Sequence, residues 1–262
     1  MRLTVLGSGS SGNGYVLEAR NSALLIECGV PPKVMHTVAR VRVSKIVGCI
    51  VSHEHIDHAK YAESYAQMGI PIYASQGTCR AIIEHKEKAG RYFPVGSLRQ
   101  MGPLSTNTLP DGWKVRTFDV EHDAAEPFGF IVEHREAGRI LFITDTSYCK
   151  YCFRDLAPDH ILVEANYDDG LLNTNVVSGV VDNLRAERTR RSHMSIRQAC
   201  DLIRANMTAD LKTVVLLHLS RDNSNAALFA RKAEETALFA RVFTAGKGLA
   251  VQLDKNENLA VL

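Results

Sequence analysis

The sequence predicts an α/β fold in which two β-sheets pack face to face with helices outside, as one domain over residues 1–262. Short apolar or alternating runs bounded by Gly, Asn and Ser indicate strands. These runs come in clusters with intermittent helices rather than in strict βαβ alternation. The chain's 262 residues suffice for a full core, and no Pro/Ser-rich linker or internal repeat divides it.

Apolar patterns place the elements along the chain. The expected strands are residues 3–6, 15–19, 23–27, 47–52, 113–120, 128–134, 139–144, 161–165 and 213–219. The expected helices are residues 59–68, 77–89, 195–207 and 226–239, the third with Ser192 or Ser195 as its N-cap. A last strand pair is expected over 249–262, turned at 254–258. Residues 166–192 are polar and lack periodicity, which indicates a long loop that serves as a lid or is disordered.

Composition and charge exclude several classes of protein. The chain has 31 basic and 29 acidic residues, a net charge of +2, so it has no globally basic coat for nucleic acid, although a local patch remains open. No run of 18 apolar residues predicts a membrane span, and no secretory signal is visible. The six cysteines, including the lone C-x-x-C pair Cys149 and Cys152, are interpreted as reduced structural thiols. We therefore expect a cytoplasmic protein.

A glycine-rich stretch near the N-terminus imitates a dinucleotide-binding motif. Residues 7–12 read Gly-Ser-Gly-Ser-Ser-Gly after a strand, and Glu27 lies at the distance of a ribose-binding acid. A dinucleotide site requires a helix to begin at the third glycine. Here another strand begins at Tyr15, which leaves no room for such a helix. A tight turn between two strands is the better interpretation.

The informative stretch is residues 53–58, which read His-Glu-His-Ile-Asp-His directly after a predicted strand. In an extended segment His53 and His55 point to one side. Asp57 and His58 enter the next helix and can face a second position. Imidazole and carboxylate suit zinc, and also manganese or iron. One loop can thus serve two metal ions, with a solvated polar loop as the alternative.

The stretch resembles the signature of the metallo-β-lactamase superfamily, and the rest of that pattern follows in order. It is completed by His122, Asp145 and His218, each placed after a predicted strand. The resemblance implies an αββα sandwich of two mixed β-sheets flanked by helices, with the metals at one edge of the sheets. It also implies that His53, His55 and His122 bind one divalent ion, that Asp57, His58 and His218 bind another, and that Asp145 bridges both.

Further motifs resemble the YycJ/WalJ group of bacterial metallohydrolases, with RNase Z and the PhnP phosphodiesterases as near relatives. They are Ser-Gly-Ser-Ser-Gly-Asn at 8–13, Glu-Ala-Asn-Tyr-Asp at 164–168, Ser-His-Met-Ser at 192–195 and His-Leu-Ser-Arg-Asp-Asn at 218–223. Tyr167 and Ser192 depart from the group, which usually has His and Gly there. The resemblance implies a phosphodiesterase, a DNA exonuclease above all, that uses a hydroxide bridging two ions of zinc or manganese, or of iron.

The resemblance also gives roles to other side chains. Asp57 and His193 are the candidate catalytic residues, since a histidine near the scissile phosphate can act as general acid. The alternative for His193 is a helix-start residue without chemistry. Arginines within residues 166–192 match phosphate oxygens, or form a solvated charged loop. The expected substrate contacts are Ser10, Asn13, Asn166, Arg190, Arg191 and Ser220, and the neighbouring arginines of the patch are Arg185 and Arg188.

Other functions remain open at this point. The expected partner is nucleic acid, DNA rather than RNA, and no membrane. A small-molecule or cyclic-phosphate phosphodiesterase and an RNA-processing nuclease are the first alternatives. An iron-dependent oxygenase or redox protein on the same fold, and a non-catalytic nucleic-acid-binding module, are the others.

Overall fold

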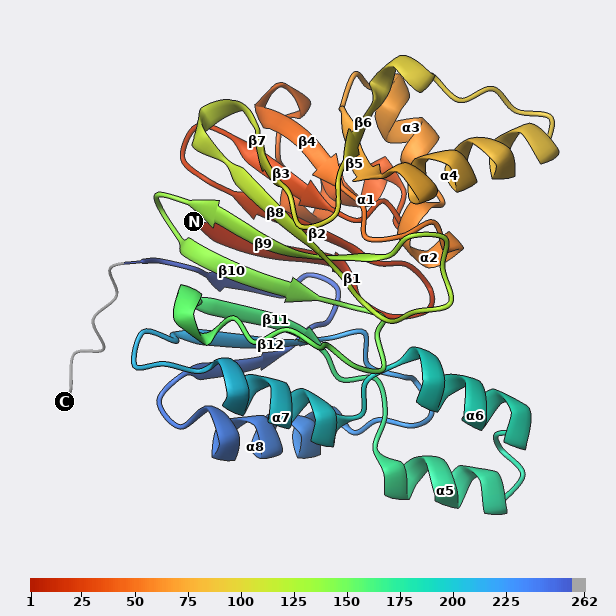
Figure 1. Ribbon diagram of the computed structural model, residues 1–262, viewed down its shortest axis with the longest axis vertical. Coiled ribbons are helices and arrows are strands. Elements are labelled where there is room, and N and C mark those ends of the chain that lie inside the picture. Colours follow the sequence, from red (N-terminus) through yellow and green to blue (C-terminus); the bar gives the residue numbers. More distant parts are fainter. Residues whose placement is uncertain (256–262) are drawn as a thin grey trace.

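Two mixed sheets of seven strands each pack face to face in the computed structural model, which describes residues 1–255 (Figure 1). In spatial order the first sheet consists of β14 (Ala250–Gln252), β1 (Arg2–Gly7), β2 (Gly14–Glu18), β3 (Ala23–Ile26), β4 (Ile46–Ile50), β5 (Ile72–Ser75) and β6 (Leu98–Met101). The second consists of β13 (Arg241–Thr244), β12 (Thr213–Leu217), β11 (His160–Glu164), β10 (Gly138–Ile143), β9 (Phe128–His134), β8 (Lys114–Asp119) and β7 (Thr106–Thr108). The expected sandwich is confirmed.

Each sheet is antiparallel over one part and parallel over the other. In the first sheet β3 to β6 run parallel, and in the second β10 to β13 do so. The carboxyl ends of parallel strands meet at one edge of a sheet, where polar side chains that follow them can converge. Residues after β3, β4, β10, β11 and β12 are therefore brought to two such edges.

Alternation along the strands divides the apolar residues between three layers. In β4 and just beyond it, Ile50 faces the core between the sheets, while Cys49 and Val51 face outward. Trp113 and Phe142 are among the side chains buried between the sheets. The outer faces are covered by α3 (Ala62–Gln67) and α4 (Gln76–Lys88) on the first sheet, and by α7 (Ile196–Asn206) and α8 (Ala226–Ala237) on the second.

Of the four expected helices, three form as predicted and one is broken in two. Three expected helices are confirmed as α4, α7 and α8, and Ser195 is the N-cap of α7, in a capping box with Gln198. The helix expected over 59–68 is instead two pieces, α2 (Ile56–Ala59) and α3. It breaks because the Tyr61 N–H donates to the Cys28 carbonyl, which belongs to another segment. The shorter helical segments are α1 (Pro32–Val34), η1 (Met35–Ala39), η2 (Val43–Lys45), η3 (Val95–Ser97), η4 (Pro110–Gly112) and η5 (Arg154–Leu156).

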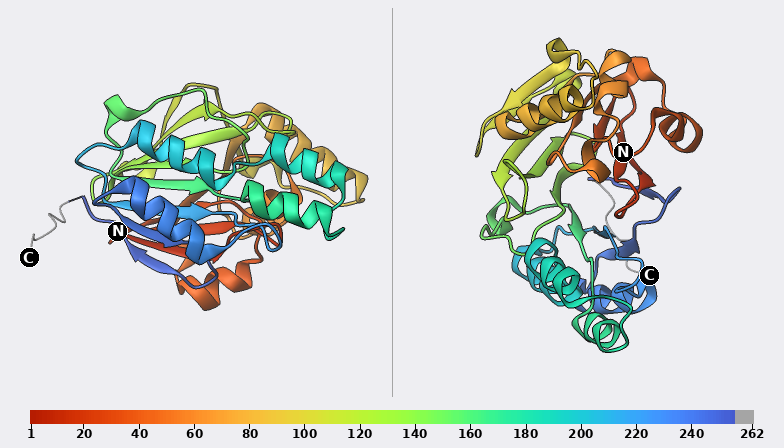
Figure 2. Two further views of the ribbon diagram at one scale, coloured as in Figure 1. Left: turned by 90° about the horizontal axis from the view of Figure 1, so that it is seen from below. Right: turned by 90° about the vertical axis from the view of Figure 1, so that its right-hand side faces the viewer.

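The expectation of a long loop over residues 166–192 is wrong. The segment forms a hairpin of two helices, α5 (Asp169–Val177) and α6 (Asn183–Ser192), capped by Asp168 and Asp182. Its own core is small (Tyr167, Leu172, Val181 and Ala186), so the apolar periodicity that reveals a helix is absent. In Figure 2 the hairpin lies beyond α7 and α8, at one end of the sandwich.

The sequence pattern did not predict four short strands. The structure adds β5, β6, β7 and β13, each of three or four residues, too short for a clear alternation. The expected C-terminal strand pair is represented by β14, which pairs with β1. Its expected return strand lies outside the described residues. Within residues 1–255 no helix is long and apolar enough to cross a membrane.

The glycine-rich stretch is a turn between two strands, as predicted, and it supports the loop of residues 53–58. β1 and β2 pair antiparallel on either side of it. The Asn13 N–H donates to the Asp57 carbonyl at 2.7 Å, and Gly29 lies against the same carbonyl. A Cβ on Gly29 would be 1.7 Å from that oxygen, so only glycine allows the two backbones to approach.

We therefore expect Gly29→Ala to displace the Asp57 segment and to lower the free energy of unfolding by about 2–3 kcal/mol, because the added methyl overlaps backbone. Thermal denaturation measures this as a fall in Tm of about 5–10 °C. Gly246→Ala is the matched control, since a Cβ there meets nothing within 4 Å. Equal melting of the two variants would contradict the packing role of Gly29.

Candidate metal centre

The seven predicted metal ligands lie at strand ends and come together. His53, His55, Asp57 and His58 follow β4, His122 follows β8, Asp145 follows β10, and His218 directly follows β12. Their ligand atoms form two groups, in each of which all atoms lie within 4.8 Å of one another. The first group is His53, His55 and His122, and the second is Asp57, His58, Asp145 and His218. The two groups contain the residues predicted for the two ions, and the binding of the ions themselves stays a prediction.

In the first group the outer ring nitrogens are hydrogen-bonded and the inner ones face each other. His55 Nε2 lies 3.1 Å from the Asp123 carbonyl, and His122 Nδ1 lies 2.9 Å from the Ser192 carbonyl. A neutral imidazole that donates to each carbonyl keeps a lone pair on its other nitrogen. His55 Nδ1 and His122 Nε2 are 3.1 Å apart, so two lone pairs meet. A cation that both nitrogens bind relieves this repulsion.

Asp145 joins the second group across the sandwich. Its carboxylate lies 3.1 Å from His58 Nε2 and 2.5 Å from His218 Nδ1. The Asp57 carboxylate lies 3.3 Å from His58 Nε2 and 3.6 Å from His218 Nε2. Asp145 Oδ2 is also 3.9 Å from both His53 Nε2 and His122 Nε2 in the first group. Asp145 is therefore placed between the two groups.

The residues fit divalent metal ions. His53 Nε2 is buried without a hydrogen-bond partner, while its Nδ1 lies 2.9 Å from Ser52 Oγ. An unpartnered buried nitrogen is costly unless something binds it. Imidazole nitrogens and carboxylate oxygens are the donors that zinc, manganese and iron accept. A third group of possible donors, Asp145, Glu164, His193 and His218, overlaps the second, and no group within the described residues includes a cysteine.

Two buried glutamates support the ligands from behind. Glu27, directly after β3, lies 3.5 Å from His58 Nδ1 and accepts the Ser52 N–H. Glu164, at the end of β11, accepts the N–H groups of Thr146 and Met194. Carboxylates in this position fix the orientation of imidazole ligands and raise their basicity.

The backbone is strained at three of these positions. Glu27, Asp145 and His218 have φ values of 66°, 45° and 51°, in the left-handed region that non-glycine residues rarely adopt. Each costs on the order of 1–3 kcal/mol and persists only where the surroundings hold it. All three lie just after a strand, so the turn directs the side chain toward the centre of the site.

Burial and neighbouring charges shift the pKa values of His53 and Asp145 in the directions that metal binding needs, whereas for His58 the Asp145 and Glu27 carboxylates outweigh burial and raise the pKa. Burial lowers the pKa of His53 well below its usual value, which keeps the imidazole neutral. Burial by itself raises the pKa of Asp145, but His218 and His58 outweigh it and hold that pKa well below its usual value. Metal ligands must be free of protons, and both residues meet this requirement.

His193 is held beside the cluster by Glu164. Its Nδ1 lies 2.7 Å from Glu164 Oε1, which leaves Nε2 for a substrate. Burial opposes the charged imidazole, but the Glu164 carboxylate prevails and raises the pKa of His193 to about 9. His193 can therefore carry the proton that a general acid must supply.

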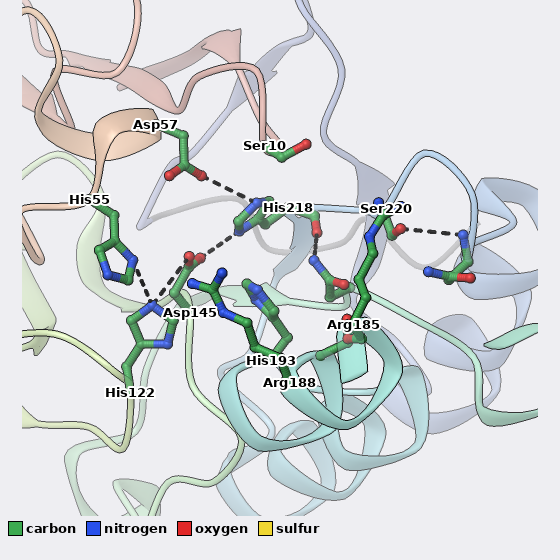
Figure 3. Close-up of a pocket in the computed structure, with 13 residues that line it drawn as sticks. Ser10, His55, Asp57, His122, Asp145, Arg185, Arg188, His193, His218 and Ser220 are labelled. Carbon is green, nitrogen blue, oxygen red and sulfur yellow. Dashed lines mark hydrogen bonds and ion pairs between the residues drawn. The ribbon is translucent and has the colours of Figure 1, made fainter. Parts of the chain in front are cut away.

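The cluster opens into a pocket of about 280 Å³ (Figure 3). Ser10, Asn166 and Ser220 line it, as their predicted role as substrate contacts requires. Arg190 and Arg191 are not among its lining residues; two other arginines of α6, Arg185 and Arg188, take that place. The complete lining is Ser10, His55, Asp57, His122, Asp145, Asn166, Arg185, Arg188, Thr189, His193, His218, Ser220 and Asn223.

Asn13 lies behind the ligands rather than in the pocket. It is fully buried, and its Nδ2 is 3.2 Å from Asp57 Oδ2 and 3.0 Å from His58 Nε2. In the same turn, Ser8 Oγ accepts the His218 N–H at 2.8 Å. The glycine-rich turn therefore positions ligands from both sheets.

Cys149 and Cys152 are free thiols that contact different backbone carbonyls, those of Tyr151 and Ala205. Cys149 is half-buried, and burial raises its pKa, which disfavours the reactive thiolate. The pair lies in the loop after Asp145, outside the pocket of the metal cluster.

A protein-family model described as the beta-lactamase superfamily domain matches residues 24–219, well over half of the chain. The chain belongs to this superfamily. Members are metal-dependent hydrolases, and the chain is an enzyme of that class. The family predicted from the residue motifs is thereby confirmed.

Relatives of known name match almost the whole chain. It is 26% identical to a protein named exodeoxyribonuclease YycJ from Bacillus anthracis, over 96% of this chain and 94% of that protein. It is 24% identical to exodeoxyribonuclease WalJ of Streptococcus pneumoniae, over 85% and 83% of the two chains. The predicted resemblance to this group is confirmed at modest identity.

Solved structures share the fold. The metallo-β-lactamase fold protein YhfI from Bacillus subtilis matches with a TM-score of 0.70 at 19% identity, covering 96% of this chain and 99% of that one. Human tRNase Z, short form, matches with 0.65 at 17% identity, covering 97% and 99%. A diphosphatase of the PhnP family matches with 0.66 at 16% identity, covering 97% and 98%.

Sequence reasoning missed some functional positions. The glycine-rich stretch suggests for Glu27 only the place of a ribose-binding acid, and the motif at 164–168 predicts no role for Glu164. Both directly follow or end a buried strand, the same position as the ligands, and that signal could have found them. Arg185 and Arg188 line the pocket in place of Arg190 and Arg191 because of the helical register of α6. A segment predicted as a loop has no such register, so the sequence could not show which arginines face the pocket.

If Asp145 connects two metal sites, Asp145→Asn will lower the metal content of the purified protein from about two ions per chain to about one or fewer. The amide is neutral and is a weaker ligand than the carboxylate. Mass spectrometry of the dialysed protein for metals measures this. His36→Ala, at an exposed histidine outside the cluster, is the control. Full metal content in Asp145→Asn would contradict the bridging role.

Proposed function

We propose that the chain is a dinuclear metal-dependent phosphodiesterase that removes nucleotides from the ends of DNA. The observation that carries the proposal is one pocket that is lined by residues of both donor groups, by His193 and by two arginines. Such a pocket suits the hydrolysis of an anionic ester, because cationic groups surround the position of the developing charge. The relatives named exodeoxyribonucleases support DNA as the substrate.

The metal ions would be held by the two donor groups. His53, His55 and His122 would hold one ion and Asp57, His58 and His218 the other, with Asp145 between them. Bound divalent ions supply Lewis-acid charge and a water of lowered pKa at neutral pH. Glu27 and Asn13 keep His58 and Asp57 in orientation, because they contact those side chains and are buried.

The protein's own contribution to bond cleavage is a proton at His193. The leaving oxygen of a phosphodiester needs a proton, and His193 Nε2 donates it while Glu164 holds Nδ1. Because Glu164 is buried and also binds two backbone N–H groups, the imidazole keeps one orientation. His193 is the C-cap residue of α6, so the hairpin determines its place.

A small phosphodiester is the second candidate substrate. A pocket of about 280 Å³ lies at the lower end of the range for small-molecule sites, which favours one compact phosphate ester over a duplex.

We further propose that residues 1–262 act as one domain, since the Asp145–His58 contact joins ligands that follow strands of different sheets.

Purified protein supplied with zinc or manganese is expected to shorten end-labelled DNA from its ends, and His55→Ala to abolish this because it removes a metal ligand. Gel electrophoresis of labelled single- and double-stranded DNA and RNA measures the products. His36→Ala is the matched control. Cleavage of only RNA or only a small ester would replace DNA as the substrate. Cleavage of none of these would refute the proposed function.

His193→Ala is expected to slow hydrolysis of DNA by about 10²–10⁴-fold in kcat. The same variant is expected to lose much less on a p-nitrophenyl phosphodiester, whose leaving group departs without a proton. Steady-state kinetics on both substrates separates a proton donor from a structural residue. Equal losses on the two substrates would contradict a general acid.

A further inference from the structure

The helix α6 presents one face to the pocket. Arg185, Arg188 and Thr189 line it, and their spacing of three and four residues places them on the same side of a helix. Arg190 instead donates to Asn173 of α5, and Arg191 is 81% exposed beside Glu187. Of the four arginines of α6, two thus face the metal cluster.

Both pocket arginines form weak ion pairs with acidic residues on the loops that carry metal ligands. Arg188 lies 3.2 Å from Asp123, the residue after His122. Arg185 lies 3.5 Å from Asp222, in the loop after His218. The two arginine side chains are 69% and 57% exposed, and ion pairs this exposed contribute little to stability. An anion that binds guanidinium more tightly, such as a phosphate, can therefore displace the carboxylates with little loss of folding stability.

The two guanidinium groups lie on different sides of His193. In Figure 3 Arg188 extends from α6 toward His122 and Asp145, and Arg185 extends toward Ser220. A guanidinium group can donate two parallel hydrogen bonds to the oxygens of one phosphate. The present contacts with exposed carboxylates, at 3.2 and 3.5 Å, are weaker than such a pair of bonds. A phosphate held by the metal cluster and His193 would therefore have an arginine toward each neighbouring position.

We propose that Arg185 and Arg188 form a phosphate clamp, which releases Asp222 and Asp123 and binds the phosphates next to the scissile one. The inference rests on the proposed function and deepens it, because it makes the substrate a single strand of several phosphates rather than a lone phosphodiester. The clamp supplies local positive charge in a chain of net charge +2. In this proposal α6 has two roles: it positions His193, and its arginines bind the nucleic-acid strand.

A tether is the rival explanation of the same contacts. The two ion pairs join α6 to the loops of His122 and His218, so their loss could displace His193 and slow every substrate. A clamp instead acts through neighbouring phosphates and weakens binding of a strand far more than of a compact ester. The two roles therefore differ in substrate dependence.

The experiment measures strand binding and small-ester turnover in metal-loaded protein. A fluorescein-labelled single strand with phosphorothioate linkages, which resist hydrolysis, is titrated with wild type, Arg185→Ala and Arg188→Ala, and anisotropy is followed. We expect each variant to raise Kd about tenfold. The slope of log Kd against log salt should fall by about 0.7 for each lost phosphate contact.

Two further variants and a small ester complete the test. Arg231→Ala is the matched control, since Arg231 is also 69% exposed beside an acidic residue but lies on α8, outside the pocket. Arg188→Lys should restore part of the affinity, because it keeps the charge without the paired contacts. Turnover of thymidine 5′-p-nitrophenyl phosphate should fall much less than strand affinity in both alanine variants.

Several results would overturn the clamp. They are unchanged strand affinity in both alanine variants, a loss in Arg191→Ala but not in Arg188→Ala, and parallel losses on the strand and the small ester, which indicate a tether. Absence of strand binding by wild type also overturns it. If wild type binds the strand but hydrolyses neither DNA nor the ester, the proposed function fails while the binding data still decide the clamp.

Discussion

The buried carboxylate of Asp145 is the interaction on which the site depends. It contacts His58, which follows a strand of the first sheet, and His218, which follows a strand of the second. A buried carboxylate is stable only with cationic or hydrogen-bonding partners, so its position requires both loops to converge on it. Thr144 Oγ1 donates to the same group from the adjacent residue. The packing of the two sheets thus sets the distance between ligands.

That arrangement is held by features with no catalytic chemistry of their own. Gly29 allows one backbone to lie against the Asp57 carbonyl, and Ser8 accepts the N–H of His218. Glu27, Asp145 and His218 keep strained φ values because buried hydrogen bonds surround them. The strain places polar side chains at strand exits without lengthening the loops. The rigid sandwich therefore sustains a geometry that a loop alone would not keep.

The α5–α6 hairpin brings the second set of charges to the same pocket. Its own core is small, and it adjoins the site through His193, the two pocket arginines and their acidic partners. Acidic side chains on the ligand loops balance those arginines, so a net charge near zero coexists with cationic groups at the pocket. Net charge describes the whole surface, whereas recognition of an anion depends on the few groups beside it.

The sequence by itself determined the sandwich, most long strands, and α4, α7 and α8, because alternation and capping are local signals. The two donor groups were implied by the resemblance of the histidines and aspartates after strands to the pattern of the superfamily. Only the tertiary structure decided the rest. Short parallel strands such as β5 gain their pairing from neighbours distant in the chain. The hairpin lacks an apolar stripe, so its helical register, and with it the choice of Arg185 and Arg188 over Arg190 and Arg191 for the pocket lining, followed from capping and docking. The structure also decided how the histidines of the site come together. Six of the ten meet around Asp145, because strands that are far apart in the sequence end at the same place.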